Sequence, residues 1–198
     1  MARDIKADIL ERRKTILIIL TAVFFLISLL FDKNLSLLLN YSSVSSNLIY
    51  RPAYLLNKTA TLIIVFISLA LIFFLNRKKV LHAAAALVSA EVFGLAIKQL
   101  VGRERPFITG INAPIELIKS KYYAWDSSFP SLHAATSFAL IPFMPKEIRI
   151  YWMVLAVAVS LTRVYFGLHY LSDVIFGAAI GLAVGILISR IKSRINKK

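Results

Sequence analysis

Long apolar runs separated by short polar stretches repeat along the whole chain. Six of them predict membrane-spanning helices, at about 15–31, 59–75, 80–101, 131–144, 148–165 and 169–191. A helix of about 20 apolar residues matches the hydrocarbon thickness of a bilayer, so the run at 131–144 is short for a crossing. The pattern therefore predicts an all-α fold, an integral membrane bundle of six transmembrane helices forming a single domain over residues 1–198.

The first apolar run follows the basic leader Arg12-Arg13-Lys14, as the apolar core of a signal peptide also would. The polar residues Asp32-Lys33-Asn34 come directly after it and do not resemble a small-residue cleavage site. We therefore interpret this run as a membrane anchor. The stretch 35–56 that follows is expected to be a long non-cytoplasmic connection, either a lid along the membrane interface or an ordinary amphipathic loop.

Composition agrees with a membrane protein. Of the 198 residues, 59% are hydrophobic and only 17% are charged, with a mean hydropathy of +0.74, whereas soluble domains carry about 25% charged residues. The net charge of +14 does not indicate nucleic-acid binding, because the basic residues gather at the ends of apolar runs. The chain has no cysteine, which excludes disulfides, a thiol nucleophile and thiolate metal ligands.

The distribution of basic residues predicts the orientation. Most of the 24 lysines and arginines lie in the N-terminal tail, at 77–79, at 146–149 and in the C-terminal tail. Cytoplasmic loops carry such an excess of positive charge. Both termini are therefore expected in the cytoplasm, in a multi-pass protein of the cell (inner or plasma) membrane. The 102–130 and 166–168 connections then lie on the opposite, extracytoplasmic or periplasmic face.

Three polar motifs fall at that face. The first contains Lys98 and Arg105-Pro106, which share one helix side if the helix continues to the proline. An arginine fork and a lysine suit phosphate oxygens, although both residues could equally be interfacial anchors. The second motif, Pro130-Ser131-Leu132-His133, begins a helix. Its free amides attract anions and His133 could deliver a proton, although ordinary helix capping is the alternative.

The third motif runs from Arg163 to Asp173. His169 and Asp173 are four positions apart in the expected first turn of the last helix, so they face the same way. A carboxylate on one ring nitrogen leaves the other nitrogen free to attack phosphorus; a plain interfacial ion pair is the alternative. Gly167 permits a tight turn that brings Arg163 alongside. The carboxylate Glu91 is expected to be structural and to face the bundle.

The pattern Lys-x6-Arg-Pro, Pro-Ser-x-His and Arg-x5-His-x3-Asp resembles the type 2 phosphatidic acid phosphatase superfamily. This group includes membrane lipid phosphatases and soluble vanadium haloperoxidases, and the apolar spans exclude the latter. The resemblance covers a core from about residue 98 to 173. The chain departs from the family pattern at Leu132, where glycine is usual, and at Thr162, where serine is usual.

The resemblance implies the site. His169 would be the nucleophile that forms a phosphohistidine, Asp173 its orienting partner, and His133 the general acid. The remaining residues would bind phosphate: Lys98, Arg105, Ser131, the Leu132 amide and Arg163. No metal and no other cofactor is implied, and one carboxylate among several cations suits a divalent ion poorly.

The expected function is hydrolysis of a lipid phosphate or pyrophosphate on the non-cytoplasmic leaflet. Candidate substrates are lipid A 1-phosphate, phosphatidylglycerophosphate, undecaprenyl diphosphate and phosphatidate. The expected partner is that membrane lipid, with no nucleic acid and no obligatory protein partner. Two alternatives stay open: a phosphotransferase of the same family, and a non-catalytic lipid-binding or lipid-transport protein.

Overall fold

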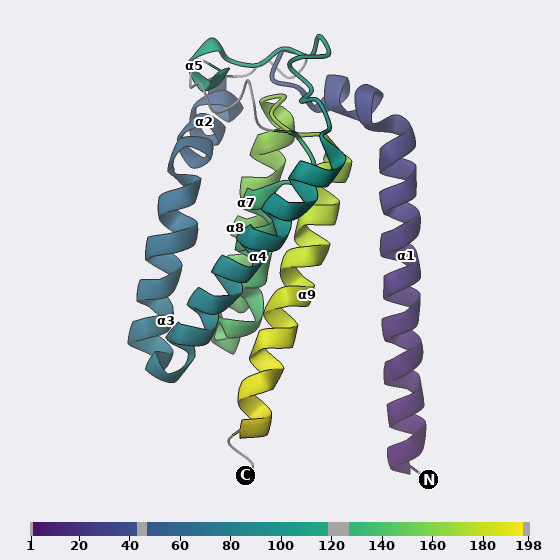
Figure 1. Ribbon diagram of the computed structural model, residues 1–198, viewed down its shortest axis with the longest axis vertical. Coiled ribbons are helices and arrows are strands. Elements are labelled where there is room, and N and C mark those ends of the chain that lie inside the picture. Colours follow the sequence, from purple (N-terminus) through teal and green to yellow (C-terminus); the bar gives the residue numbers. More distant parts are fainter. Residues whose placement is uncertain (1, 43–46, 119–126, 196–198) are drawn as a thin grey trace.

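The computed structural model describes residues 2–42, 47–118 and 127–195, which contain helices and no strands. Figure 1 shows them as a bundle in which α1 stands at one side and the other helices cluster together. The elements are α1 (Ala2–Leu39), α2 (Asn47–Leu62), the π-helix η1 (Ile63–Ile67), α3 (Ser68–Asn76), the 3-10 turn η2 (Arg77–Lys79), α4 (Val80–Val101), α5 (Ile115–Ile118), α7 (Leu132–Ala139), the 3-10 turn η3 (Ile141–Phe143), α8 (Lys146–Tyr165) and α9 (Leu171–Ile195).

Within the described residues, four helical stretches are long and apolar enough to cross a membrane: Ala22–Leu39, Leu48–Val101, Lys146–Tyr165 and Leu171–Ile191. The second holds 54 residues and reverses direction at η2, so that α3 and α4 lie antiparallel (Figure 1). The apolar segment Leu132–Phe143 is shorter. The all-helical, membrane-compatible fold is thus confirmed, whereas the count of six spans stays a prediction.

Several expected boundaries were wrong. The expected third helix, 80–101, matches α4, but α1 runs from Ala2 to Leu39 and thus beyond the polar residues Asp32-Lys33-Asn34. Asp32 is tolerated inside the helix because it is buried and pairs with groups from distant parts of the chain. The expected long connection over 35–56 is therefore mostly helix, since α1 ends at Leu39 and α2 begins at Asn47.

The short helix α7 packs directly on α9. Glycines recur every fourth residue on α9, at Gly177, Gly181 and Gly185, and each faces a backbone carbonyl oxygen at the α7 side. Small residues of this kind let two helix backbones approach closely. The close packing matters because α7 follows Ser131 and carries His133, while α9 carries Asp173.

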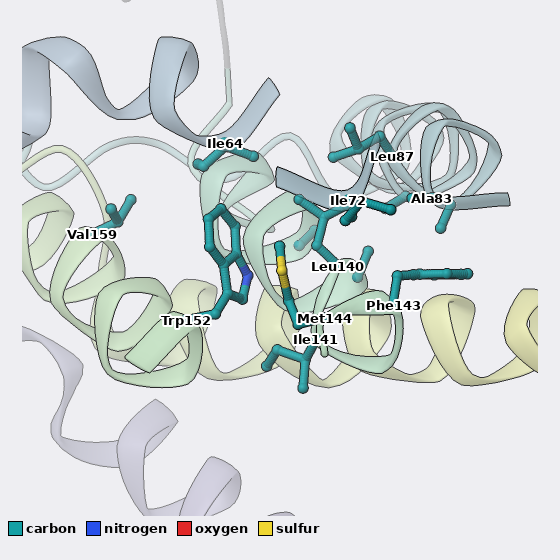
Figure 2. Close-up of a cluster of buried hydrophobic side chains, with 14 of the residues drawn as sticks. Ile64, Ile72, Ala83, Leu87, Leu140, Ile141, Phe143, Met144, Trp152 and Val159 are labelled. Atoms are coloured by element: carbon teal, nitrogen blue, oxygen red, sulfur yellow. The ribbon is translucent and has the colours of Figure 1, made fainter. Parts of the chain in front are cut away.

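An apolar core surrounds the end of α7 and η3. Figure 2 shows its side chains converging from several helices: Ile64, Ile72, Ala83, Leu87, Leu140, Ile141, Phe143, Met144, Trp152 and Val159. The indole nitrogen of Trp152 donates a hydrogen bond of 3.0 Å to the carbonyl of Ser137, so the one polar atom of that ring is satisfied. The start of α1 and the end of α9 share one end of the bundle, and the α8–α9 turn lies at the opposite end (Figure 1).

Candidate active site

The two cations of the first motif come from different local structures. Lys98 lies in the last turn of α4, and the helix stops at Gly102, which adopts the left-handed conformation (φ 61°) and donates to the Lys98 carbonyl at 3.0 Å. Arg105 therefore follows the helix, and the expectation of a shared helix face was wrong: glycine ends α4 before the proline can. Both side chains are nevertheless buried and line the same cavity.

Each of these cations is held by backbone carbonyls. The Lys98 ammonium donates to the carbonyl oxygen of Ser127, and the Ser127 hydroxyl returns a bond of 3.0 Å to the Lys98 carbonyl. The Arg105 guanidinium donates to the Leu168 carbonyl at 2.8 Å. Such contacts fix where the two side chains point.

The second motif opens α7 as expected. Ser131 is the N-cap residue, but its hydroxyl makes no capping bond, is buried, and has no hydrogen-bond partner within the described part of the chain. Ordinary capping therefore does not explain this serine. The side chain of Leu132 fits against Gly94 of α4, where an added Cβ would lie 2.3 Å from its Cδ2 atom. Gly94 thus makes room for the leucine.

His133 lines the cavity from the first turn of α7. Its Nε2 atom lies 3.1 Å from the hydroxyl oxygen of Thr61, a residue of α2 that also lines the cavity. Thr61 is separated from His133 by 72 positions, and no spacing pattern in the sequence pointed to it.

The third motif forms a tight turn between α8 and α9. Gly167 has φ 64°, a conformation that favours glycine, and an added Cβ would lie 2.6 Å from the carbonyl oxygen of Asn112. The amides of Leu168 and His169 both donate to the Arg163 carbonyl, at 2.9 and 3.2 Å. The turn therefore brings Arg163 and His169 together, although His169 precedes α9 instead of lying in its first turn.

The hydrogen bonds around His169 define its tautomer. Nε2 lies 3.3 Å from Nη1 of Arg105, and because a guanidinium can only donate, Nε2 must be the unprotonated nitrogen. Nδ1 then carries the proton and lies 3.4 Å from Oδ2 of Asp173, a contact too loosely aligned for a strong hydrogen bond. Burial, followed by the charge of Arg105, lowers the pKa of His169 to about 4, so the ring is neutral at neutral pH.

Asp173 is fully buried and held on both oxygens. Oδ2 accepts from the Tyr170 amide at 2.8 Å and from the Ser128 hydroxyl. Oδ1 accepts from Nη1 of Arg103 at 2.8 Å. Neither Arg103 nor Ser128 was expected at the site. The signal that could have indicated Arg103 is a third cation beside Lys98 and Arg105 in a chain with few charges.

A cavity of about 530 Å³ joins these groups. Its polar end is lined by Lys98, Arg105, His133, Arg163 and His169, whereas Ser131 and Asp173 lie behind that surface. Its apolar walls come from η1, α3, α4 and α7 and include Ile64, Val65, Leu69, Ala84, Leu87, Val88, Val92 and Leu132. Val88 and Val92 are 64% and 58% exposed, so the cavity opens through the side of the bundle, where lipid chains would lie.

Glu91 lines this cavity and is half-buried, which agrees with the expected bundle-facing position. The residues from Lys119 to Asp126, which precede the second motif, lie outside the described residues. Among the residues that the structure describes, no group of three or more histidine, aspartate or glutamate side chains is arranged to hold a metal ion.

Two curated proteins show similarity over part of the chain. One is the bacitracin transport permease protein BcrC of Bacillus licheniformis, 37% identical over 112 residues that cover 54% of this chain and 52% of that protein. The other is an undecaprenyl-diphosphatase of Sulfolobus acidocaldarius, 35% identical over 130 residues that cover 64% and 61%. The chain thus spans about half to three fifths of the length of these relatives.

A solved structure matches the fold. The crystal structure of a transmembrane PAP2-type phosphatidylglycerolphosphate phosphatase from Bacillus subtilis has a TM-score of 0.68, with 20% sequence identity over 89% of this chain and 96% of that one. The family model described as the PAP2 superfamily matches residues 79–197, more than half of the chain and all three motifs. The resemblance inferred from those motifs is therefore confirmed, and the protein belongs to the PAP2 superfamily.

Proposed function

We propose that this protein hydrolyses the phosphate or pyrophosphate group of a membrane lipid through a phosphohistidine intermediate. The observation that carries the proposal is the position of the His169 imidazole, which lines the cavity together with the cations Lys98, Arg105 and Arg163. Its lowered pKa keeps the ring neutral at neutral pH. A neutral imidazole has a lone pair available for attack, and cations offset the charge that develops on the transferred group.

Phosphate binding is the first step. Lys98, Arg105 and Arg163 bind the phosphate oxygens, with the Ser131 hydroxyl and the Leu132 amide as further donors. The unpartnered Ser131 hydroxyl supports this role, because a buried hydroxyl without a partner is costly unless a ligand satisfies it. When Arg105 turns to a phosphate oxygen it releases Nε2 of His169, which frees the lone pair.

Phosphoryl transfer follows. Nε2 of His169 attacks phosphorus, the bond from phosphorus to the leaving oxygen breaks, and His133 gives that oxygen its proton. The imidazolium that forms on His169 is stabilised by the Asp173 carboxylate, which faces its Nδ1–H group. Water then attacks the phosphohistidine, His133 accepts the proton of the water, and inorganic phosphate leaves with His169 restored.

The cavity supports a lipid as the substrate. The cations gather at its end near the α8–α9 turn, whereas most of the other lining residues are apolar, with Thr61, Glu91 and Thr136 as the polar exceptions. A phosphate held by the cations would leave its hydrocarbon chain in the groove between α2–α3 and α4. The undecaprenyl-diphosphatase relative favours a polyprenyl diphosphate as the first substrate to test. The positive charge of the opposite end supports an active site on the non-cytoplasmic face.

The test is release of inorganic phosphate by the purified protein in detergent, with a chelator present. The panel contains undecaprenyl diphosphate, phosphatidate, phosphatidylglycerophosphate and lipid A. We expect turnover of at least one lipid and its loss in His169→Ala. His82→Ala is the matched control, because His82 lies near the start of α4 and outside the cavity lining. Equal turnover by wild type and His169→Ala would contradict the proposal.

Two other functions are distinguished by the same assay. A phosphotransferase would form the phosphohistidine but release product only when a lipid or sugar acceptor is added. The BcrC relative is named a transport permease protein, which suggests transport instead. A transport or binding protein would retain the lipid without any acid-labile phosphohistidine, whereas the hydrolase forms and discharges one.

A further inference from the structure

Arg103 connects two buried carboxylates from distant parts of the chain. Its Nη1 atom donates to Oδ1 of Asp173 at 2.8 Å, and its Nη2 atom donates to Oδ2 of Asp32 at 2.8 Å. Asp32 is 4% exposed and Asp173 is not exposed at all, while Arg103 keeps 25% of its side chain exposed. The guanidinium also lies 4.0 Å from the centre of the Tyr170 ring, which restricts its position further.

Asp32 also fixes the chain next to Asp173. The amide of Ser172 donates to Oδ1 of Asp32 at 3.0 Å, and the Ser172 hydroxyl donates to Oδ2 of the same carboxylate. Arg103 donates to the Ser172 hydroxyl as well, at 2.7 Å. Helix α1 is therefore bonded to the first turn of α9 at the residue directly before the carboxylate that faces His169.

The geometry places Arg103 where it controls the direction of the Asp173 carboxylate. The Ser128 hydroxyl and the Tyr170 amide hold Oδ2, the oxygen that faces His169, and Arg103 holds Oδ1. With both oxygens fixed, the plane of the carboxylate is defined. Without Arg103 the group can turn about its Cβ–Cγ bond, and Oδ2 would no longer stay opposite Nδ1 of His169.

Burying the carboxylates of Asp32 and Asp173 inside a helical bundle costs free energy. Ionised groups inside membrane segments are expensive and commonly mark function, and apolar residues of similar size could fasten α1 at least as well. If the network served only to attach α1 to the bundle, Arg103 would need to bind Asp32 alone and not Asp173 as well. The arrangement is explained if the network serves catalysis.

We propose that Arg103 and Asp32 are positioning residues, which act through Asp173 to hold His169 in the orientation and tautomer needed for attack on phosphorus. Asp32 lies outside residues 79–197, the part of the chain that matches the superfamily model, so this role adds α1 to the catalytic apparatus. The inference rests on the proposed function, because it assumes that His169 is the nucleophile.

The experiment compares kcat and KM of Arg103→Met, Arg103→Lys, Asp32→Ala and Asp32→Asn with those of wild type. We expect Arg103→Met and Asp32→Ala to lower kcat by about 10- to 100-fold, the range found when a histidine loses an orienting partner. KM should stay within about twofold, since neither residue lines the cavity. Arg103→Lys and Asp32→Asn should recover part of kcat, because each keeps one hydrogen bond of the network.

Matched controls make the same charge changes at neighbouring positions. Glu104→Gln and Lys33→Met alter exposed residues adjacent to Arg103 and Asp32 and should leave kcat unchanged. All rates are referred to the fraction of folded protein, measured by size exclusion and thermal unfolding in detergent. If Arg103→Met or Asp32→Ala fails to fold, kcat and KM of Arg103→Lys and Asp32→Asn are compared with those of wild type instead.

A double-variant measurement separates positioning from a structural role. In an Asp173→Asn background, Arg103→Lys should cost no further kcat, since its effect passes through the carboxylate already removed. Variants that melt earlier but keep kcat, or losses that add to that of Asp173→Asn, would overturn the inference. If wild type itself releases no phosphate and forms no phosphohistidine, the proposed function is wrong. If wild type is active and the variants are equally active, the proposed function stands and the positioning role of Arg103 and Asp32 is wrong.

Discussion

Gly181→Ala is expected to damage both stability and catalysis, because a side chain at Gly181 would meet the backbone of α7 more closely than at Gly177 or Gly185. An added Cβ would lie 1.9 Å from the backbone oxygen of Ala135 and 2.7 Å from its carbonyl carbon. A carbon and a carbonyl oxygen normally approach to about 3.3 Å, so the two helices must separate by about 1.4 Å. Backbone atoms cannot rotate aside as a flexible side chain could.

The magnitude follows from that separation. Forcing one extra carbon into close packing costs about 1–3 kcal/mol of unfolding free energy. His133 lies on α7 and Asp173 on α9, so the displacement also moves the proposed general acid away from the pair formed by His169 and Asp173. A misplacement of about 1 Å can lower kcat by about 100-fold.

The assay measures thermal unfolding in detergent together with kcat for phosphate release. Ala183→Val is the matched control: it adds two carbons on the same helix but at an exposed position, and it should change neither quantity. Gly181→Ala with wild-type melting and wild-type kcat would show that the α7–α9 contact does not position the site as we argue.

Four further predictions concern the site itself. Because burial and Arg105 lower the pKa of His169 to about 4, the rate of histidine phosphorylation in a rapid-quench experiment should stay level down to about pH 5 and fall through about pH 4; a fall centred near pH 6.5 would contradict this. The unfolded chain binds that proton near pH 6.5, so the free energy of unfolding should decrease as the pH falls from about 6.5 to 4. Thr61→Val removes the hydroxyl 3.1 Å from Nε2 of His133 and should lower kcat about fivefold, the equivalent of one hydrogen bond; Thr59→Val, whose hydroxyl bonds within its own helix, should retain wild-type kcat. In Gly167→Ala the new residue would adopt φ 64° and its Cβ would lie 2.6 Å from the Asn112 carbonyl oxygen. Its melting temperature and kcat should therefore both fall. Unchanged values would argue against a rigid turn.

Much of the fold was predictable from the sequence because membrane helices are defined by local hydrophobicity. Residues 80–101 were placed correctly from their apolar run, and α8 and α9 within a few residues. The end of α1 was predicted wrongly, because the prediction that the helix stops before Asp32 assumes that this carboxylate must be exposed to water. In the structure its partners are Arg103 and Ser172, which lie 71 and 140 positions away, and no local pattern specifies contacts so distant.

The residues of the candidate site were likewise named by the sequence, through three motifs with fixed spacings at the ends of apolar runs. Only the tertiary structure brings them together. Lys98 and Arg105 do not share a helix face, since Gly102 ends α4 between them, and their convergence on His169 depends on how α4 lies against the α8–α9 turn.

The second layer of the site was decided by the tertiary structure alone. Arg103 contacts Asp173 and Asp32 across 70 and 71 positions of the chain, and Thr61 contacts His133 across 72. The sequence by itself therefore indicated which groups are candidates for the chemistry, because reactive side chains are recognisable by type and spacing. Their orientation was decided by packing, because a hydrogen bond depends on where two side chains meet in space and not on their separation along the chain.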